Sequence, residues 1–291
     1  MSRTLCVIGD PVHHSKSPLL HNTMCRVLGL DFTYHAQTVK ADALPDFLAQ
    51  AKAEGYAGFN ATMPFKELLL PYLDGLDPLA EKLGAANTVC IKDSKLYGYN
   101  TDCPGYIAAL KGQGFDPKGK NVVLLGAGGA AKAVAVGLCE AGARVAVSNR
   151  TAERVKPLMA LYPDRISALP WLDQDPTLPV HPSCTPPIHP LHLTLSTTDL
   201  LVNATSLGMA GQGQFSSFAF LHSLPKTCLV SDLIYHPSPT ALLEAADGLG
   251  LKTMDGLPLL IHQAILALEH FAEVKIDPAA VLPALEEALK G

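Results

Sequence analysis

A glycine-rich turn between two apolar segments constrains the fold of this chain more than any other feature. Residues 126–131 read Gly-Ala-Gly-Gly-Ala-Ala and fit the pattern G-x-G-x-x-A. The apolar segments at 121–125 and 144–148 have the composition of strands, and 130–141 has that of a helix. Strand, glycine turn, helix and strand, in this order, predict a dinucleotide-binding βαβ unit.

The physics of such a turn gives each small residue a role. Gly126 permits a tight turn, Gly128 lets the backbone approach a pyrophosphate, and Ala131 lets the helix pack closely on the strand. The free N–H groups at the start of the helix then face the phosphates. A βαβ unit whose turn is merely tight is the alternative. The candidate cofactor contacts on this turn are Gly126, Ala127, Gly128, Gly129 and Ala130.

The end of the second strand bears on the choice of cofactor. NAD-binding units usually carry an acidic residue there, which holds the ribose 2′-hydroxyl. Here the strand continues into Asn149, Arg150 and Thr151, with no acid at that point, and Arg154 follows one helical turn later. A planar guanidinium suits a 2′-phosphate. The sequence therefore favours NADP over NAD and adds these four residues to the cofactor contacts, although Arg150 could also be an ordinary exposed arginine.

Size and charge narrow the class of protein. A chain of 291 residues is consistent with two domains. The net charge of -5 leaves no basic surplus for nucleic acid or anionic lipid, and no apolar stretch is long enough to span a membrane. The 7 cysteines are scattered and form no C-x-x-C pair, which argues against a disulfide frame or zinc site and for a cytoplasmic location.

Two polar stretches follow apolar segments near the N-terminus. Ser15 and Ser17 flank a predicted helix start, where their hydroxyls could bind a small anion or simply cap the helix. Thr62 and Lys66 lie around a proline after a predicted strand, where sites in α/β proteins usually form. Lys66 could serve as an acid or base in a dry cleft, or could be a solvated lysine.

Three later stretches leave similar alternatives open. Asp102 could cap a helix predicted from residue 106 or be a carboxylate of a site. Gln263 lies on a predicted helix, where it could equally be a surface residue. Residues 173–194 are rich in Pro and His and predict an irregular excursion, whose His and Cys spacing fits no structural zinc pattern.

Taken together, these stretches resemble the shikimate dehydrogenase family over nearly the whole chain. The resemblance rests on many motifs in order rather than on any single one. They are Gly-Asp-Pro-Val-x-His-Ser-x-Ser-Pro, Asn-x-Thr-x-Pro-x-Lys, Gly-Ala-x-Asn-Thr, Gly-x-Asn-Thr-Asp-x-x-Gly, Gly-Ala-Gly-Gly-Ala, Asn-Arg-Thr, Asn-Ala-Thr-Ser and Asp-x-x-Tyr-x-Pro.

The resemblance implies an α/β protein of two domains that reduces 3-dehydroshikimate to shikimate with NADPH, on the route to aromatic amino acids. Residues 1–103 and 257–291 would form the substrate-binding and catalytic domain, so that the C-terminal helices return to the first domain. Residues 104–256 would form a Rossmann-like NADP-binding domain.

The resemblance also implies roles for single residues. Lys66 and Asp102 would form the catalytic pair, and Leu233 and Gly256 would contact the nicotinamide end of NADP. The remaining residues would bind the substrate, Ser15 and Ser17 through its carboxylate. They are Ser15, Ser17, Thr62, Asn87, Tyr235 and Gln263.

Two rival functions remain at this point. A quinate/shikimate dehydrogenase of the same fold would accept a broader range of substrates or use NAD. A non-catalytic sensor of NADP or another ligand is a rival of a different class, but it would need neither Lys66 nor Asp102. A monomer and a homodimer both fit the sequence, and no nucleic acid or membrane partner is expected.

Overall fold

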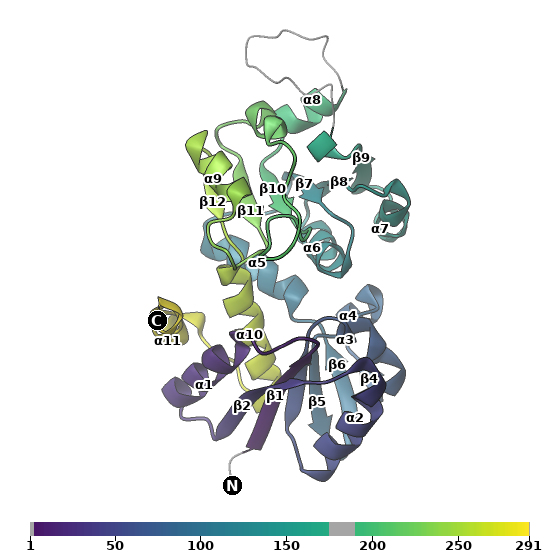
Figure 1. Cartoon of the computed structure of the whole chain (residues 1–291), viewed down its shortest axis with the longest axis vertical. Coiled ribbons are helices and arrows are strands. Elements are labelled where there is room, and N and C mark those ends of the chain that lie inside the picture. Colours follow the sequence, from purple (N-terminus) through teal and green to yellow (C-terminus); the bar gives the residue numbers. More distant parts are fainter. Residues whose placement is uncertain (1–2, 175–189, 291) are drawn as a thin grey trace. The chain divides into compact units, whose positions relative to one another are not determined.

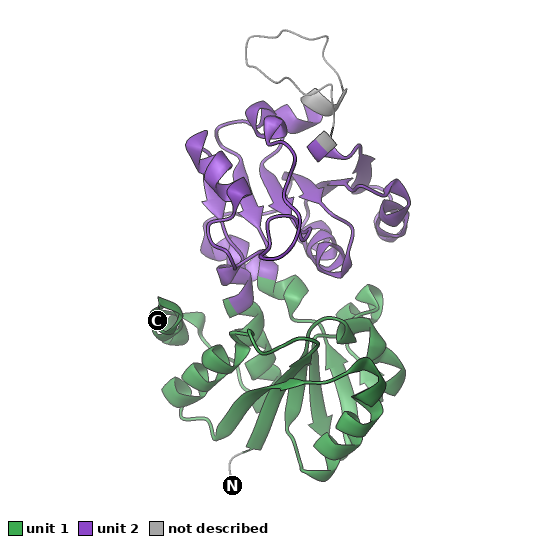
Figure 2. Ribbon diagram, viewed as in Figure 1, with its two compact units in different colours: residues 1–105, 261–291 green, residues 106–260 purple. Residues whose placement is uncertain are grey.

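The computed structural model describes residues 3–174 and 190–290 and divides into two compact units. Figure 2 distinguishes unit 1, which comprises Met1–Gly105 and Ile261–Gly291, from unit 2, which comprises Tyr106–Leu260. The unit boundaries fall inside two helices, α5 (Asp102–Gly112) and α10 (Leu257–Ala272). Most of the Pro- and His-rich segment expected to form an excursion, residues 175–189, lies outside the described residues.

Unit 1 is built on a mixed six-stranded sheet with the order β2-β1-β3-β5-β6-β4 (Figure 1). The sheet is parallel across β2, β1 and β3, whereas β5 runs antiparallel to both β3 and β6. The strands are β1 (Arg3–Gly9), β2 (Phe32–Thr38), β3 (Gly58–Ala61), β4 (Gly75–Leu76), β5 (Thr88–Lys92) and β6 (Lys95–Tyr99).

Helices cover both faces of this sheet. On one face, Cys6, Ile8 and Phe59 pack with Phe47 of α2 and Phe65 of α3 in one buried apolar cluster. The opposite face carries α1, whose His21 lies beside Phe271 of α10. The helices of unit 1 other than α5 and α10 are α1 (Ser17–Leu28), α2 (Leu44–Ala53), α3 (Phe65–Leu68), α4 (Pro78–Leu83) and α11 (Pro278–Lys290), with short 3-10 turns at Ala41–Ala43 and Leu70–Tyr72.

Unit 2 is built on a parallel six-stranded sheet with the order β12-β11-β10-β7-β8-β9. Counted from β7, this is the 3-2-1-4-5-6 order of dinucleotide-binding folds, and the strand order reverses between β7 and β10. The strands are β7 (Asn121–Leu125), β8 (Arg144–Ser148), β9 (Ile166–Leu169), β10 (Leu200–Asn203), β11 (Leu229–Asp232) and β12 (Lys252–Met254).

The central strands β7, β10 and β11 of unit 2 are buried on both faces, because alternate residues enter two separate cores. Val122 and Leu124 of β7 pack in a cluster with α5, α6 and α7 residues, and Val123 and Leu125 pack in another with α9 residues. Parallel sheets of this kind read as continuous apolar runs. The helices are α6 (Gly129–Glu140), α7 (Lys156–Leu161), α8 (Pro190–Ser196) and α9 (Ala241–Gly248), with 3-10 turns at Ala152–Val155, Leu172–Gln174 and Ala219–Ser223.

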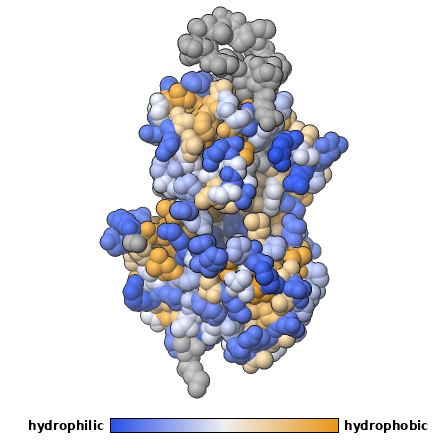
Figure 3. Space-filling view, in the orientation of Figure 1, coloured by the Kyte–Doolittle hydropathy of each residue, from blue (hydrophilic) through white to orange (hydrophobic). Residues whose placement is uncertain are grey.

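The surface is mixed in polarity. On the face drawn in Figure 3, hydrophilic side chains predominate and hydrophobic ones gather in small groups. Within the described ranges, no helix combines the length and apolar character needed to cross a membrane.

Candidate active site

Four chain segments of unit 1 meet at one edge of its sheet, namely the edge formed by the C-terminal ends of β1, β3 and β6. The parallel strands β1 and β3 both end there, and β6 ends there too, because β5 between them runs in the opposite direction. Thr88, the first residue of β5, pairs with Asn60 near the end of β3 and with Tyr99 at the end of β6. The polar residues that follow β1, β3 and β6 and precede β5 are therefore brought to one edge.

Lys66 and Asp102 form an ion pair at this edge. Lys66 lies on α3, one short loop after β3, and Asp102 is the first residue of α5, which follows β6. The Lys66 Nζ donates a hydrogen bond of 2.6 Å to Asp102 Oδ2, and the two side chains are 33% and 20% exposed. Both charged groups thus remain accessible to a ligand.

Asp102 does not act as the acceptor that caps α5. Asn100 takes that part, since its Oδ1 accepts a hydrogen bond of 3.3 Å from the Cys103 N–H. The sequence had predicted this helix only from residue 106, whereas α5 begins at Asp102. The earlier start places the Asp102 carboxylate on the first turn of the helix.

Asn87 joins the ends of three strands. Its backbone N–H donates to the Tyr99 carbonyl at the end of β6, and its backbone carbonyl accepts from the Ala61 N–H at the end of β3. Its side-chain Oδ1 accepts from the Thr101 N–H at 2.8 Å, and its Nδ2 donates to Thr101 Oγ1 at 3.0 Å. With the side chain only 3% exposed, the amide fixes the segment that leads into Asp102.

The two serines and Thr62 complete this edge. Ser15 Oγ accepts a hydrogen bond of 3.2 Å from the Ser17 N–H, but the N-cap residue of α1 is Lys16, which makes no side-chain capping bond. Ser17 is buried, and Thr62 is half-buried directly after β3. The Thr62 N–H donates to the Ile8 carbonyl of β1, which ties the two loops together.

The other two predicted substrate contacts lie elsewhere in the chain. Gln263, on α10 in unit 1, is buried with 9% of its surface exposed, so it is not an ordinary surface residue. Tyr235 lies in unit 2, on the loop after β11. Burial raises the pKa of the Tyr235 phenol, which therefore stays protonated and able to donate a hydrogen bond at neutral pH.

The glycine turn of unit 2 joins β7 to α6 as expected. Gly126 has a φ of +106°, and a Cβ there would lie 3.0 Å from the Ala204 carbonyl oxygen, so only glycine fits. By contrast, a Cβ on Gly128 or Gly129 would meet nothing within 4 Å. The N-terminus of α6 therefore opens onto free space, with Ala127 half-buried and Ala130 exposed beside it. Such a backbone cradle fits the diphosphate of a dinucleotide.

The turn after β8 presents two arginines. Asn149 Nδ2 donates a hydrogen bond of 2.7 Å to the Thr151 carbonyl, and the Arg154 N–H donates to the same carbonyl at 3.1 Å. These bonds fold the backbone tightly, and Arg150 and Arg154 are both exposed. Neither guanidinium has a hydrogen bond or ion pair with residues 3–174 or 190–290. A 2′-phosphate beside this turn could therefore pair with either of them.

Leu233 and Gly256 are in contact at the ends of β11 and β12. A Cβ on Gly256 would lie 2.2 Å from the Leu233 carbonyl oxygen, so the close approach requires glycine. The Leu233 N–H donates to the Asn203 carbonyl at the end of β10. Asn203 Nδ2 in turn donates to Asp232 Oδ1 at 3.0 Å, and Thr240 Oγ1 donates to Asp232 Oδ2 at 2.7 Å.

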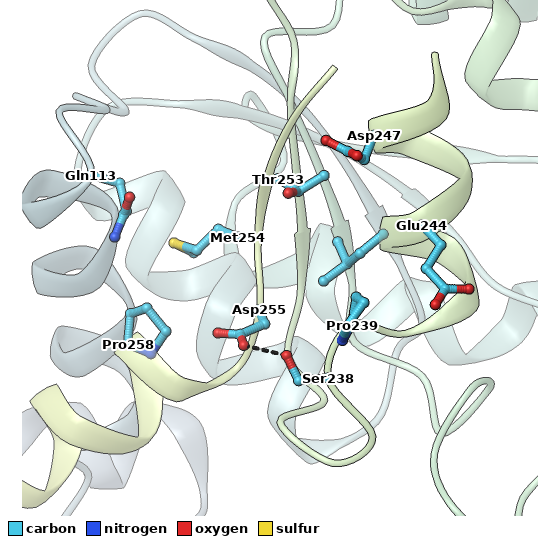
Figure 4. Close-up of a pocket in the computed structure, with 10 residues that line it drawn as sticks. Gln113, Ser238, Pro239, Glu244, Asp247, Thr253, Met254, Asp255 and Pro258 are labelled. Atoms are coloured by element: carbon cyan, nitrogen blue, oxygen red, sulfur yellow. Dashed lines mark hydrogen bonds between the residues drawn. The ribbon is translucent and has the colours of Figure 1, made fainter. Parts of the chain in front are cut away.

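A pocket of about 380 Å³ beside β12 contains none of the predicted site residues. Its wall carries the carboxylates of Glu244, Asp247 and Asp255, and Ser238 donates a hydrogen bond of 2.6 Å to Asp255 (Figure 4). Three carboxylates repel an anion. This pocket therefore suits neither the phosphates of a nucleotide nor the carboxylate of a substrate.

Sequence reasoning overlooked the interior residues that hold the site. Asn60, Tyr34 and Thr101 are 6%, 4% and 1% exposed and connect the strands through side-chain hydrogen bonds. Asn60 begins the motif Asn-x-Thr-x-Pro-x-Lys, two residues before Thr62. Thr101 lies in Gly-x-Asn-Thr-Asp-x-x-Gly, directly before Asp102. That spacing was the only available signal, because a buried polar side chain has no periodic pattern.

Two family models match the chain. Residues 7–89 match the shikimate dehydrogenase substrate binding domain, and residues 108–175 match shikimate / quinate 5-dehydrogenase. Among curated proteins, the shikimate dehydrogenase (NADP(+)) of Rhodopseudomonas palustris is 39% identical over 97% of this chain and 95% of its own length. That of Shouchella clausii is 37% identical over 93% of both chains.

Solved structures agree with these relatives. A shikimate 5-dehydrogenase from Thermus thermophilus in complex with NADP(H) and shikimate has 34% identity, a TM-score of 0.81 and coverage of 98% of this chain and 99% of its own. A Listeria monocytogenes shikimate 5-dehydrogenase in complex with shikimate and NAD has 30% identity, a TM-score of 0.84 and coverage of 99% and 96%. A 5-ketofructose reductase of Gluconobacter has 33% identity, a TM-score of 0.81 and coverage of 99% of both. Because these relatives match it along almost its full length, this chain belongs to the shikimate dehydrogenase family.

Proposed function

We propose that this protein is an NADP-dependent shikimate dehydrogenase that reversibly reduces 3-dehydroshikimate to shikimate on the route to aromatic amino acids. The observation that carries the proposal is the accessible ion pair of Lys66 and Asp102, at 2.6 Å, in a chain of this family. We assign substrate binding to residues 1–103 and 257–291 and NADP binding to residues 104–256. A ligand sensor would have no use for such a pair.

Lys66 is the proposed proton donor. When NADPH is bound it supplies the hydride, and negative charge then develops on the substrate's former carbonyl oxygen. A lysine ammonium has three N–H donors, of which Asp102 occupies one in the hydrogen bond of 2.6 Å. The others remain for the substrate oxygen, to which Lys66 donates a proton or a strong hydrogen bond. Asp102 holds the ammonium in place.

The remaining polar residues of unit 1 orient the substrate. We propose that Ser15 and Ser17 bind its carboxylate through hydroxyl and backbone N–H groups at the start of α1. We assign the contacts with the ring hydroxyls and carboxylate to Thr62, Asn87, Tyr235 and Gln263. These groups hold the substrate's ketone in the position for reduction, because a misplaced substrate loses most of the rate.

NADP is held by the residues of unit 2 in this proposal. The diphosphate lies against Gly126, Ala127, Gly128, Gly129 and Ala130 at the N-terminus of α6. The remaining proposed contacts are Asn149, Arg150, Thr151 and Arg154 at the 2′-phosphate and Leu233 and Gly256 at the nicotinamide.

An assay of nicotinamide reduction with purified protein tests the proposal. Shikimate and quinate are each combined with NADP⁺ and NAD⁺, and 5-ketofructose is tested in the reverse direction with NADPH. Fast turnover of shikimate with NADP⁺ alone is expected. Comparable rates with quinate or NAD⁺ would instead support a dehydrogenase of broader specificity. The second family model covers shikimate and quinate enzymes, and the Listeria enzyme was solved with NAD. Turnover of 5-ketofructose without shikimate turnover would reject the proposed substrate.

The location and assembly of the enzyme are also proposed. The scattered cysteines are consistent with a reducing compartment, and we propose a cytoplasmic enzyme that is a monomer or homodimer. Size-exclusion chromatography with light scattering distinguishes these two states from larger assemblies.

A further inference from the structure

Tyr34 is a buried residue of β2 that packs against α1. Its ring stacks on that of His21 of α1, with centroids 4.2 Å apart and planes at 3°. Its hydroxyl donates a hydrogen bond of 2.8 Å to Asn60 Oδ1 on β3. The two strands are not neighbours, because β1 lies between them, so the tyrosine side chain reaches across β1.

Strand register makes this contact possible. Leu5 of β1 pairs with Tyr34 on one side and with Gly58 on the other. Asn60 lies two residues beyond Gly58, and residues two apart on a strand point to the same face. Tyr34 and Asn60 therefore share the face that packs against α1.

The Tyr34 hydroxyl completes the hydrogen bonding of the Asn60 amide. Asn60 Nδ2 donates to the Asn87 backbone carbonyl at 3.1 Å and to Thr88 Oγ1 at 2.9 Å. If the amide rotated by half a turn, its oxygen would face the Asn87 carbonyl oxygen, and two acceptors would repel each other. The amide oxygen therefore lies on the opposite side, where the Tyr34 hydroxyl supplies its donor.

The connection continues from Asn60 to the segment that carries Asp102. Asn87, which Asn60 contacts, binds Thr101 through two hydrogen bonds, and Thr101 immediately precedes Asp102. The Tyr34 hydroxyl is thus linked, through Asn60 and Asn87, to the segment that carries the proposed catalytic carboxylate.

We propose that Tyr34 is a positioning residue, whose hydroxyl sets Asn87 and the Asp102 segment through Asn60. His21 holds the ring in place by stacking. The inference rests on the proposed function, since the reaction is the readout. Tyr34 itself contacts neither reactant. Its effect therefore falls on substrate binding and turnover in unit 1 and leaves the NADP residues of unit 2 unchanged.

The test is Tyr34→Phe, which keeps the stacked ring and removes only the hydroxyl. kcat and KM are measured for shikimate and for NADP⁺, together with Tm. We expect kcat/KM for shikimate to fall about tenfold, because the buried Asn60 amide oxygen loses its hydrogen-bond donor. KM for NADP⁺ should stay within about twofold of the wild type. Tyr97→Phe, which removes a hydroxyl from β6 of the same sheet, is the matched control and should leave both constants unchanged.

A double-mutant cycle separates positioning from general stability. Asn60→Ala removes the proposed intermediary, and in that background Tyr34→Phe should change kcat/KM for shikimate by less than about threefold. Fully multiplicative effects of the two substitutions would overturn the route through Asn60. A Tyr34→Phe enzyme with a lower Tm but the wild-type kcat/KM would show a structural role only and overturn the proposal. Absence of wild-type turnover would instead reject the proposed function on which the inference rests.

Discussion

His21 makes the stability of unit 1 depend on pH in a way that can be measured. Its side chain is 1% exposed, and neither ring nitrogen has a hydrogen-bond partner in the described part of the chain. Burial lowers its pKa from the usual 6.5 to about 3. The folded protein therefore holds a neutral imidazole that resists protonation, whereas the unfolded chain does not.

The sign and size follow from proton linkage. Between about pH 6.5 and about pH 3 the unfolded state binds a proton that the folded state refuses, so acid favours unfolding. The stability from this group is present above the unfolded pKa and is lost as the pH falls towards the folded one. For a pKa of about 3 in the folded state and 6.5 in the unfolded state, the loss reaches about 2 kcal/mol at about pH 5. A loss of that size lowers Tm by roughly 4–8 °C in a protein of this length.

Thermal unfolding of the wild type and His21→Phe, at about pH 7 and about pH 5, isolates the contribution. Phenylalanine keeps an aromatic ring against Tyr34 but cannot bind a proton. The Tm of the variant should therefore fall less on acidification than that of the wild type, by roughly 4–8 °C. His35→Gln, at an exposed position on the same strand as Tyr34, is the control and should behave like the wild type. Equal decreases in the wild type and His21→Phe would refute the reasoning.

The remaining predictions concern the reaction, the cofactor and the fold. Lys66→Met should lower kcat by about 10²-fold or more with little change in KM for shikimate. The control Lys92→Met breaks an ion pair at the opposite end of β5 and should leave kcat unchanged. An unaltered kcat in Lys66→Met would exclude Lys66 as the proton donor. Arg150→Ala should raise KM for NADP⁺ about tenfold and leave that for NAD⁺ unchanged, and equal effects on both would contradict a 2′-phosphate contact. Gly256→Ala should lower the free energy of unfolding by more than about 2 kcal/mol, because its Cβ would lie 2.2 Å from the Leu233 carbonyl oxygen; an unchanged Tm would contradict this packing.

The nucleotide-binding half was the more predictable part of the fold. β7 and β8 occupy the predicted ranges without any shift, because strands buried on both faces are continuous apolar runs. The glycine turn and its helix follow from local rules of backbone geometry. The predicted family and fold class are confirmed by the relatives and solved structures, and NADP is named for the curated relatives.

The strand β2 shows why other parts escaped prediction. It forms an edge of its sheet, and Tyr34 is its only fully buried residue, so its sequence Phe-Thr-Tyr-His-Ala-Gln-Thr has no apolar run. α5 was predicted too short because Pro104 and Gly105 resemble helix breakers. Proline is tolerated in the first turn of a helix, where its missing N–H has no intrahelical partner.

Local motifs identified the site residues but not what fixes them, because the fixing groups come from distant strands. In unit 1, the backbone of Asn87 bonds Ala61 at the end of β3 and Tyr99 at the end of β6, and its buried side-chain amide bonds Thr101 after β6. Unit 2 uses the same device, since the buried Asn203 amide joins the end of β10 to Asp232 at the end of β11.

Loops at strand ends lack the hydrogen bonds of a sheet, so a satisfied interior amide supplies the rigidity that their own sequence does not. Asp102 and Leu233 each lie directly after a partner of such an amide, Thr101 in one case and Asp232 in the other. The positions of the proposed proton-transfer and nicotinamide contacts are thus set by separate networks, one in each unit. A substitution inside one network should therefore alter the kinetics of one ligand and spare those of the other.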